Sequence, residues 1–258
     1  MIYNVIKSVE SFATIIGGMS TIIIIIQFIL KLHGYLKDKR YIKTVLRFKN
    51  KECIITQTVY YNYSNTSTKE VVTNASMQSF QMINNMLYKV NYRIVPCANS
   101  FIGKNIIHIG GPASNIHVNA LFIEHNYKFE FWTPKEDKST HDNLKLSSRS
   151  IHYTEDDTRK FIIGNVKLEI KENERDYALI IRIPSDNKLG IYYSTHIIFG
   201  CKTNGTLKGI EYFTSNYKMI AKLYGKSKYC FAVPINLIDN TIAISNEKII
   251  DLTNNFFN

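Results

Sequence analysis

Residues 189–206 read LGIYYSTHIIFGCKTNGT and join an expected strand to an expected helix through a short glycine loop. The first part, residues 189–199, is the longest β-like run of the chain, because β-branched and aromatic side chains favour strands. Gly200 and Gly205 flank the polar loop that follows. Apolar residues recur at helical spacing beyond it, which predicts a helix of about 18 residues whose buried face carries Ile210, Phe213, Tyr217 and Ile220.

The same arrangement occurs earlier in the chain, at residues 105–115 (NIIHIGGPASN). The apolar run 105–109 predicts a buried strand, residues 110–115 form the loop, and a helix is expected to extend to about residue 126. In an open α/β sheet both loops would lie at the carboxyl ends of strands, where ligands usually bind. This repeated pattern of strand, glycine loop and helix is the best functional signal in the sequence.

The remaining elements follow from the periodicities of strands and helices. Strands are expected at 52–63, 127–133, 161–171, 177–184, 229–233 and 241–244, and a helix at 68–90. Strands that alternate with helices predict an α/β fold, here a three-layer domain with a partly parallel sheet. The consecutive strands at 161–184 are joined by the charged turn ENERD and predict an antiparallel hairpin inserted into that domain.

Residues 11–30 (SFATIIGGMSTIIIIIQFIL) contain no charged residue and include five consecutive isoleucines. A helix needs about 20 residues to cross the hydrocarbon core of a bilayer, so this segment predicts an N-terminal transmembrane helix. A cleaved signal peptide would have a shorter apolar region, basic residues before it and small residues after it. Here the basic residues follow the span, which favours an uncleaved anchor.

The positive charge of the 258-residue chain is concentrated next to this span. Residues 31–51 contain eight basic residues and one acid, Asp38, which together give +7 of the net charge of +11. Because cytoplasmic flanks of membrane spans carry an excess of Lys and Arg, this block places the C-terminal part in the cytoplasm. We expect a single-pass protein of the cell membrane with a short N-terminal segment (1–10), a transmembrane helix (11–30), a basic juxtamembrane stalk (31–51) and a cytoplasmic α/β domain (52–258).

Anionic lipid explains a basic block beside a membrane span better than nucleic acid does. Outside the block the chain is only mildly basic and contains acidic runs at 155–157 and 172–176. A nucleic-acid-binding domain would need a basic patch on its folded surface. We therefore expect a membrane partner and no nucleic acid. Gly17 and Gly18 would let two spans approach closely, and self-association through the span is a further hypothesis.

The two glycine loops predict an anion site, with phosphate as the preferred ligand. Glycines allow a tight turn and close approach of the backbone, and the N–H groups at a helix N-terminus attract anions. Either Ser114 or Asn115 is expected to cap the helix after the first loop, and Lys202 would add positive charge at the second. The predicted ligand-binding residues are Gly110, Gly111, Pro112, Ser114, Asn115, Gly200, Lys202, Thr203, Asn204, Gly205 and Thr206.

An ordinary structural role explains such loops as well, because glycine between a strand and a helix is common and neither loop matches GxGxxG or GxxxxGK[ST]. No catalytic residue, metal or cofactor is expected, since the four cysteines are widely spaced and the histidines form no HExxH motif. Cys201 would need a base beside it to act as a nucleophile. His108 and His196 are interpreted as buried strand residues, whereas His117 is a candidate for contact with a ligand.

Three segments resemble a pattern of poorly characterised bacterial Rossmann-like domains: strand–GGPxSN–helix at 105–126, DYALIIR at 176–182 and GCKTNGT at 200–206. The resemblance covers residues 100–235. A membrane helix joined to such a domain is also similar in layout to effectors of nucleotide-signalled antiviral systems. In those effectors a cytoplasmic domain senses a cyclic nucleotide or oligonucleotide and the helices damage the membrane. The resemblance therefore implies a nucleotide ligand and an action on the membrane.

Three functions are consistent with these features. The first is a membrane-anchored cytoplasmic sensor or effector whose nucleotide, or other phosphate ligand, binds between the two loops. The second is a membrane-tethered hydrolase that acts on a nucleotide or on its glycosidic bond. The third is a membrane interaction protein that has no small ligand.

Overall fold

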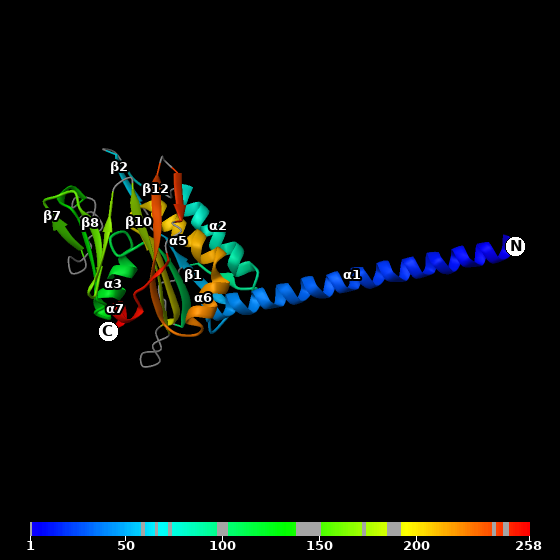
Figure 1. Ribbon diagram of the computed structural model, residues 1–258. Helices are drawn as coiled ribbons and strands as arrows, with labels where there is room; N and C mark the ends of the chain where they lie inside the picture. The colour runs from blue at the N-terminus through cyan, green and yellow to red at the C-terminus, as the bar shows by residue number, and fades with distance from the viewer. Residues whose placement is uncertain are drawn as a thin grey trace. The chain divides into compact units, whose positions relative to one another are not determined.

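The computed structural model (Figure 1) describes residues 2–57, 60–64, 67–71, 74–96, 103–137, 151–171, 174–184, 192–238, 241–244 and 248–258. The chain forms two compact units, Met1–Tyr41 and Ile42–Asn258. Most of helix α1 (Ile2–Leu46) belongs to the first unit, and its last residues, 42–46, belong to the second. The second unit thus begins earlier than residue 52, where the sequence placed the start of the α/β domain.

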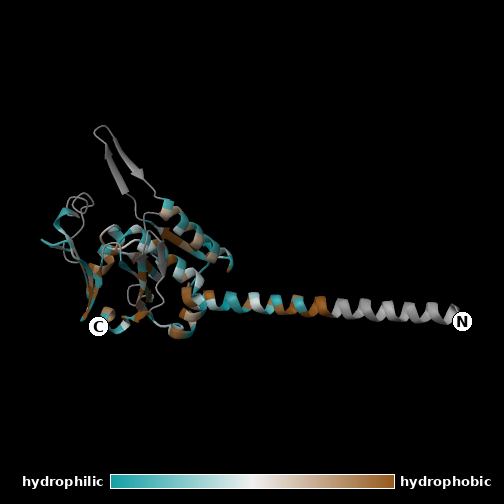
Figure 2. Ribbon diagram, turned by 45° about the horizontal axis from the view of Figure 1, so that its top comes forward, coloured by the Kyte–Doolittle hydropathy of each residue, from teal (hydrophilic) through white to brown (hydrophobic). Residues whose placement is uncertain are grey.

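Helix α1 contains the segment that the sequence predicts to cross the membrane. Residues 11–22 of that segment lie outside the residues whose side chains are described. Among the described residues, no helix combines the length and the apolar character that a bilayer span requires. The described part of α1 begins with hydrophobic residues (Figure 2), and its large apolar side chains from Ile23 to Leu30 expose 50–65% of their surface.

A mixed sheet of eight strands forms the centre of the second unit. Its strands are β1 (Glu52–Thr56), β4 (Arg93–Ile94), β5 (Lys104–Ile109), β10 (Arg175–Pro184), β11 (Tyr192–Gly200), β12 (Tyr229–Ile238), β13 (Thr241–Ile244) and β14 (Ile250–Asp251). They follow the order β13-β12-β10-β11-β5-β1-β4, with β14 paired to β12. Strands β4, β1, β5 and β11 are parallel, whereas β10 runs antiparallel to both β11 and β12. A mixed α/β domain with such a sheet fits a Rossmann-like fold.

A smaller sheet joins β6 (Phe129–Pro134), β7 (Ile151–Thr154), β8 (Arg159–Ile163) and β9 (Val166–Ile170) in the order β7-β6-β8-β9. A short 3-10 helix (Lys135–Asp137) follows β6, and β2 (Tyr60–Ser64) and β3 (Ser67–Val71) form a separate hairpin. Strands β8 and β9 are paired through a turn at Gly164.

The structure corrects the hairpin predicted at 161–184. Strands β9 and β10 share one isolated bridge, between Lys171 and Arg175, and then separate into different sheets. The hairpin in this region is β8–β9, and its turn contains Gly164 with a φ of +56°, a conformation that glycine adopts readily. Strand β10 instead pairs along its length with β11 and β12 of the main sheet.

Both faces of the main sheet are covered, which gives three layers (Figure 1). Helices α2 (Asn74–Tyr88), α5 (Thr203–Ser215) and α6 (Tyr217–Tyr224) lie on one face, where Gly209 of α5 packs on Ala178 and Ile198. The other face carries α3 (Ile116–Glu124), the smaller sheet and α7 (Thr253–Phe257). These elements share one hydrophobic cluster, whose buried members include Phe122, Phe129, Leu179, Phe199 and Phe256.

Several boundaries predicted from the sequence are confirmed, and others are displaced by pairing between distant segments. The strands expected at 105–109, 127–133, 229–233 and 241–244 are β5, β6, β12 and β13. The helix expected at 68–90 begins only at Asn74, because residues 67–71 pair with β2. The helix expected after residue 206 already begins at Thr203 and is interrupted at Asn216, which separates α5 from α6.

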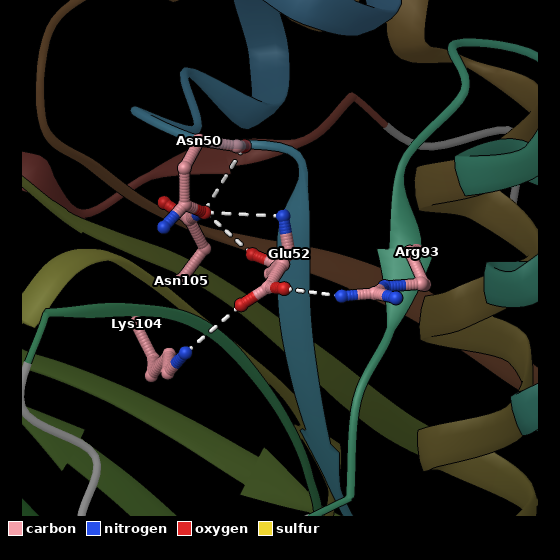
Figure 3. A network of polar contacts seen from close by, with 5 residues as sticks. All are labelled: Asn50, Glu52, Arg93, Lys104 and Asn105. Atoms are coloured by element: carbon pink, nitrogen blue, oxygen red, sulfur yellow. Dashed lines mark hydrogen bonds and ion pairs between the residues drawn. The ribbon is translucent and has the colours of Figure 1, made fainter.

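At the start of β1, Glu52 joins three neighbouring strands (Figure 3). Its carboxylate pairs with Lys104 of β5 (2.9 Å) and with Arg93 of β4 (2.5 Å). The hydrogen bonds from Lys104 and then from Arg93 lower the pKa of Glu52. Asn105 Nδ2 donates to the Glu52 carbonyl (2.7 Å) and to Asn50 Oδ1 (2.6 Å). These contacts align the starts of β4, β1 and β5 at one edge of the sheet, called the amino edge below.

The last turn of α1 is fixed to this edge by side chains of β10 and β11. A helix leaves its last four carbonyls without partners inside the helix. In α1 the Lys43 carbonyl accepts from Arg47 N (2.8 Å), and Arg47 ends the helix with a φ of +48°. The three carbonyls that follow accept from Arg182, Ser194 and His196, which lie 137–150 positions away in the sequence. All four carbonyls are therefore satisfied.

Arg182 is the centre of this arrangement and is fully buried (0% exposed). Its Nη1 donates to the carbonyls of Thr44 (3.3 Å), Val45 (3.0 Å) and Gly225 (3.3 Å), and its Nη2 donates to that of Ser227. Two of these carbonyls lie in the last turn of α1 and two directly after α6, so the guanidinium lies at the negative ends of two helix dipoles. Burial lowers the pKa of Arg182, but a guanidinium stays cationic in proteins.

Replacement of Arg182 tests this arrangement. Arg182→Ala would leave four carbonyls without this donor, one of them buried and three partly buried, and we expect it to lower the free energy of unfolding by at least about 3 kcal/mol. Arg93→Ala removes an exposed guanidinium, 74% accessible, and should change that free energy little. Urea titration of full-length protein measures both. An equally small loss for the two variants would contradict the role of Arg182.

Candidate functional site

The two predicted loops meet at the edge of the main sheet opposite the amino edge, here called the carboxyl edge. They follow β5 and β11, parallel neighbours in which Ile109 lies opposite Ile198. The N–H of Gly110 donates to the Ile198 carbonyl (3.0 Å). A Cβ on residue 111 would lie 2.5 Å from the ring of Phe199, the residue that directly precedes the second loop. The structure therefore brings residues 110–115 and 200–206 together, and glycine at 111 is required by packing.

The chain leaves these strands toward different faces of the sheet. After β5 it enters α3, which packs in the cluster with the smaller sheet. After β11 it enters α5 on the opposite face, and the connection from β1 leads to α2, which contacts α5. Open α/β sheets bind ligands where neighbouring strands send their connections to opposite faces. At the carboxyl end of β5 the connection leaves toward the face that carries α3. The connections from both neighbouring strands, β1 and β11, leave toward the opposite face.

The first loop is closed by hydrogen bonds within the protein. The N–H groups of Ser114 and Asn115 donate to the Gly111 carbonyl, at 3.0 and 2.9 Å. Asn115 is the N-cap residue of α3, and its Oδ1 accepts from the N–H groups of His117 (3.1 Å) and Val118 (3.3 Å). Of the two capping residues that the sequence allowed, Asn115 is the one that caps the helix.

Behind this cap, three buried polar side chains join β1 to β5. Asn115 Nδ2 donates to Thr56 Oγ1 (3.1 Å), which lies 2.6 Å from His108 Nδ1. The Thr56 hydroxyl thus accepts from Asn115 and forms a hydrogen bond with His108 Nδ1. Burial and, to a smaller extent, the charge of His117 lower the pKa of His108 to about 3, so the ring is neutral at pH 7.

The second loop is shorter than the sequence suggested, because α5 begins at Thr203. Lys202 is its N-cap residue, but the Lys202 side chain makes no capping hydrogen bond. Thr206 closes the first turn, since its Oγ1 accepts from Gly200 N (2.9 Å) and its N–H donates to the Lys202 carbonyl (3.1 Å). Residues expected in the loop therefore form the first turn of the helix.

A buried carboxylate, Asp176 at the start of β10, occupies the N-terminal end of α5. Asp176 is 1% exposed. Its Oδ1 accepts from the N–H groups of Tyr177 (2.7 Å) and Cys201 (3.2 Å), and its Oδ2 accepts from that of Lys202 (3.3 Å). The sequence predicted that backbone N–H groups of this loop bind an external anion. The N–H groups of residues 201 and 202 instead bind a carboxylate of the protein itself.

Gly200 and Gly205 are required by this close approach. A Cβ on residue 205 would overlap the Asp176 carboxylate, and a Cβ on residue 200 would lie 2.5 Å from the carbonyl carbon of Gly205. The two glycines therefore allow α5 to contact β11 and Asp176. Asp176 is the first residue of the DYALIIR segment, but the sequence alone assigned it no role. Its one signal in the sequence is its position, a carboxylate directly before the apolar run 177–181.

The eleven predicted binding residues fall into two groups. Those that are buried serve the fold, and they are Gly110, Gly111, Pro112, Asn115 and Gly205. Those that are exposed or partly exposed, and can face a ligand at the carboxyl edge, are Ser114, Gly200, Lys202, Thr203, Asn204 and Thr206. His117 is also exposed, with its ring centroid 6.5 Å from that of His108. Side chains, more than backbone N–H groups, are thus the groups that can hold a ligand here.

Asn119 is a polar residue of this region that sequence reasoning did not select. It lies one turn after Asn115 on α3, is 3% exposed, and its Oδ1 has no hydrogen-bond partner among the described residues. An unsatisfied buried polar atom costs about 1–3 kcal/mol. No pattern in the sequence distinguishes this asparagine from the many others of the chain.

The other candidates have structural positions. His108 and His196 are buried strand residues, as the sequence indicated. Cys201 packs against the hydrophobic cluster that contains α3. In the ranges that the structure describes, no group of three His, Cys, Asp or Glu side chains is arranged to hold a metal ion.

Comparison with known proteins gives no relative from which a function can be inferred. No family model matches the chain, and no curated protein matches it. The site is therefore interpreted from its geometry alone.

Burial of Asp176 has a consequence for the pH dependence of stability. Burial raises the pKa of Asp176 from 3.8 to about 6, although three backbone hydrogen bonds and the charge of Lys202 oppose the shift. Between these two pH values the folded state retains a proton that the unfolded state has lost. The contribution of Asp176 to stability therefore falls as the pH rises through this window, by up to about 3 kcal/mol.

Asp176→Asn should remove this dependence. His108 and His196, whose pKa values burial lowers to about 3, act in the opposite direction below pH 6.5, but they are common to both proteins. We therefore expect the stability of the variant relative to wild type to rise between pH 4 and pH 6, as measured by urea titration. Asp156→Asn, at an exposed carboxylate, should leave the slope in this window unchanged. A constant difference between Asp176→Asn and wild type would show that Asp176 is ionised throughout.

Proposed function

We propose that the chain is a membrane-anchored sensor or effector whose α/β domain binds a nucleotide, or another phosphate compound, at the carboxyl edge of β5 and β11. One observation carries the proposal: the loops that follow two parallel neighbours meet where the chain departs to opposite faces of the sheet. This is the position at which open α/β sheets usually bind their ligands.

The ligand is held by side chains in this proposal. Because Asp176 and Asn115 already accept from the backbone N–H groups at the two helix N-termini, Lys202 supplies the positive charge for phosphate. Hydroxyl and amide groups at the same edge add hydrogen bonds, from Ser114, Thr203, Asn204 and Thr206.

The same proposal places residues 11–30 in the membrane as a single-pass helix and the C-terminal domain in the cytoplasm. The apolar side chains from Ile23 to Leu30 are exposed and form a surface that a bilayer would cover. The basic residues that follow favour the cytoplasmic side. Binding of the ligand then reorients or clusters the anchors, as in the layout of nucleotide-signalled antiviral effectors.

Thermal unfolding tests the ligand site. We expect a mono-, di- or cyclic nucleotide to raise the melting temperature of the full-length protein in detergent micelles. A ligand at 100 times its Kd stabilises the fold by about 2.7 kcal/mol, which scanning fluorimetry resolves. Lys202→Ala and His117→Ala should remove most of the shift and leave the unliganded protein folded, because both side chains are exposed.

Lys167→Ala on β9 is the matched control, because it removes an equally charged, exposed side chain far from both loops in the sequence. It should respond to the ligand as wild type does. If neither nucleotides nor inorganic phosphate shift the melting of a cooperatively unfolding protein, the site is rejected.

Extraction of membranes at high pH tests the anchor. We expect the full-length protein to stay in the membrane pellet after carbonate treatment. Ile24→Lys should release it, because a lysine within the span raises the free energy of insertion by about 3 kcal/mol. Leu36→Lys places the same charge at an exposed position of α1 beyond residue 30 and should leave the protein in the pellet. Extraction of the wild type under these conditions would exclude a transmembrane anchor.

A further inference from the structure

A basic surface lies at the amino edge of the second unit, formed by two segments far apart in the sequence. The first, residues 43–51, contains Lys43, Arg47, Lys49 and Lys51 and no acid. The second, residues 222–228, contains Lys222, Lys226 and Lys228 and again no acid. All seven side chains are exposed. The sequence identified the first segment as basic but gave no reason to join the second to it, and the two together are called the basic face below.

Backbone contacts fix the two segments to each other. Arg47 Nη1 donates to the carbonyl of Lys226 (2.5 Å). Beneath them, the buried Arg182 donates to carbonyls of both segments, Val45 (3.0 Å) in the first and Gly225 (3.3 Å) in the second. The positive charges therefore lie on rigid, neighbouring backbone, and their side chains take no part in holding the segments together except for Arg47.

Six of the seven charged side chains of the basic face lack an ion pair within the described part of the chain. They are Lys43, Arg47, Lys51, Lys222, Lys226 and Lys228. Asp251 interacts with Tyr224, which lies within the second segment, and accepts from Thr253 N (2.9 Å). In the Glu52 network, by comparison, one carboxylate binds both Arg93 and Lys104 (Figure 3).

An apolar side chain is exposed among these cations. Helix α6 buries Tyr217, Ile220 and Ala221 against the domain, whereas Leu223 beside Lys222 is 59% exposed. Exposed leucine next to lysines is typical of helices that lie at a membrane surface, where the apolar group enters the interface and the cations meet lipid phosphates. A nucleic-acid site would gain nothing from Leu223, because its affinity comes from phosphate contacts.

We infer that the basic face is a second membrane contact, through which the folded domain binds the surface of an anionic bilayer. The inference goes beyond the proposed anchor and does not depend on it, because it rests on residues 43–51 and 222–228 alone. The face lies at the amino edge, and the candidate ligand site lies at the carboxyl edge of the same sheet. A domain bound in this way keeps its ligand site open to the cytoplasm.

Lysine footprinting on vesicles tests the inference. The full-length protein is reconstituted with phosphatidylcholine alone or with added phosphatidylserine, and acetylation of each lysine is measured by mass spectrometry. We expect Lys222, Lys226 and Lys228 to be labelled several-fold more slowly on the anionic vesicles at low salt, and the protection to decrease at high salt. Lys167, on the smaller sheet, should be labelled equally on both kinds of vesicle.

Charge reversal supplies the matched variants. Lys222→Glu with Lys226→Glu changes the net charge as much as Lys167→Glu with Lys171→Glu does, and all four side chains are exposed. We expect the first pair to abolish the protection of Lys228 and the second pair to leave it unchanged. The Lys226 carbonyl, which binds Arg47, is retained in both, so loss of protection does not result from loss of that contact.

The outcomes separate this inference from the anchor. Protein that resists carbonate extraction but is labelled equally on neutral and anionic vesicles overturns the inference and leaves the anchor intact. Protein that is released by carbonate but protected on anionic vesicles supports the inference without an anchor. Protection of the same lysines by an oligonucleotide at physiological salt, without protection by anionic vesicles, overturns it in favour of nucleic acid.

Discussion

Two opposite charges buried on one strand, Asp176 and Arg182 of β10, hold the helices of the domain to its sheet. Neither is paired with an opposite side-chain charge in the described structure; each lies at a helix end instead, the carboxylate at the N-terminus of α5 and the guanidinium at the C-termini of α1 and α6. Burial of an isolated charge is strongly unfavourable, and helix dipoles with their unpaired N–H and C=O groups compensate for it. Since both charges are on the same face of β10, the positions of three helices depend on this strand.

The two buried charges also lie toward opposite edges of the sheet. At the carboxyl edge, Asp176 positions the first turn of α5, next to the loop that follows β5. At the amino edge, Arg182 joins the end of α1 to the turn after α6 and so brings two basic segments together. Strand β10 is hydrogen-bonded on both sides, to β11 and to β12, and it connects the two edges. The candidate ligand site and the basic face are therefore connected through one strand of the central sheet.

The fold class could be predicted from the sequence because periodicity and turn residues are local. The run 105–109, the glycine loop and the helix after it occupy the predicted positions. What could not be predicted is pairing between distant segments. The turn ENERD has the composition of a hairpin turn, yet β10 leaves β9 for the main sheet, and the pair GN at 164–165 makes the hairpin. Likewise, residues 67–71 fit a helix locally but pair with β2.

The candidate site shows the same limit at the level of single residues. Gly200 and Gly205 indicate that something approaches the backbone closely, and the sequence cannot tell a ligand phosphate from a carboxylate of the protein. Asp176 is 25 positions from Cys201, and only the pairing of β10 with β11 brings them into contact. The same carboxylate now constrains any ligand. A phosphate bound near Lys202 lies close to Asp176, so it further raises the pKa of that carboxyl, and binding of the anion is linked to uptake of a proton.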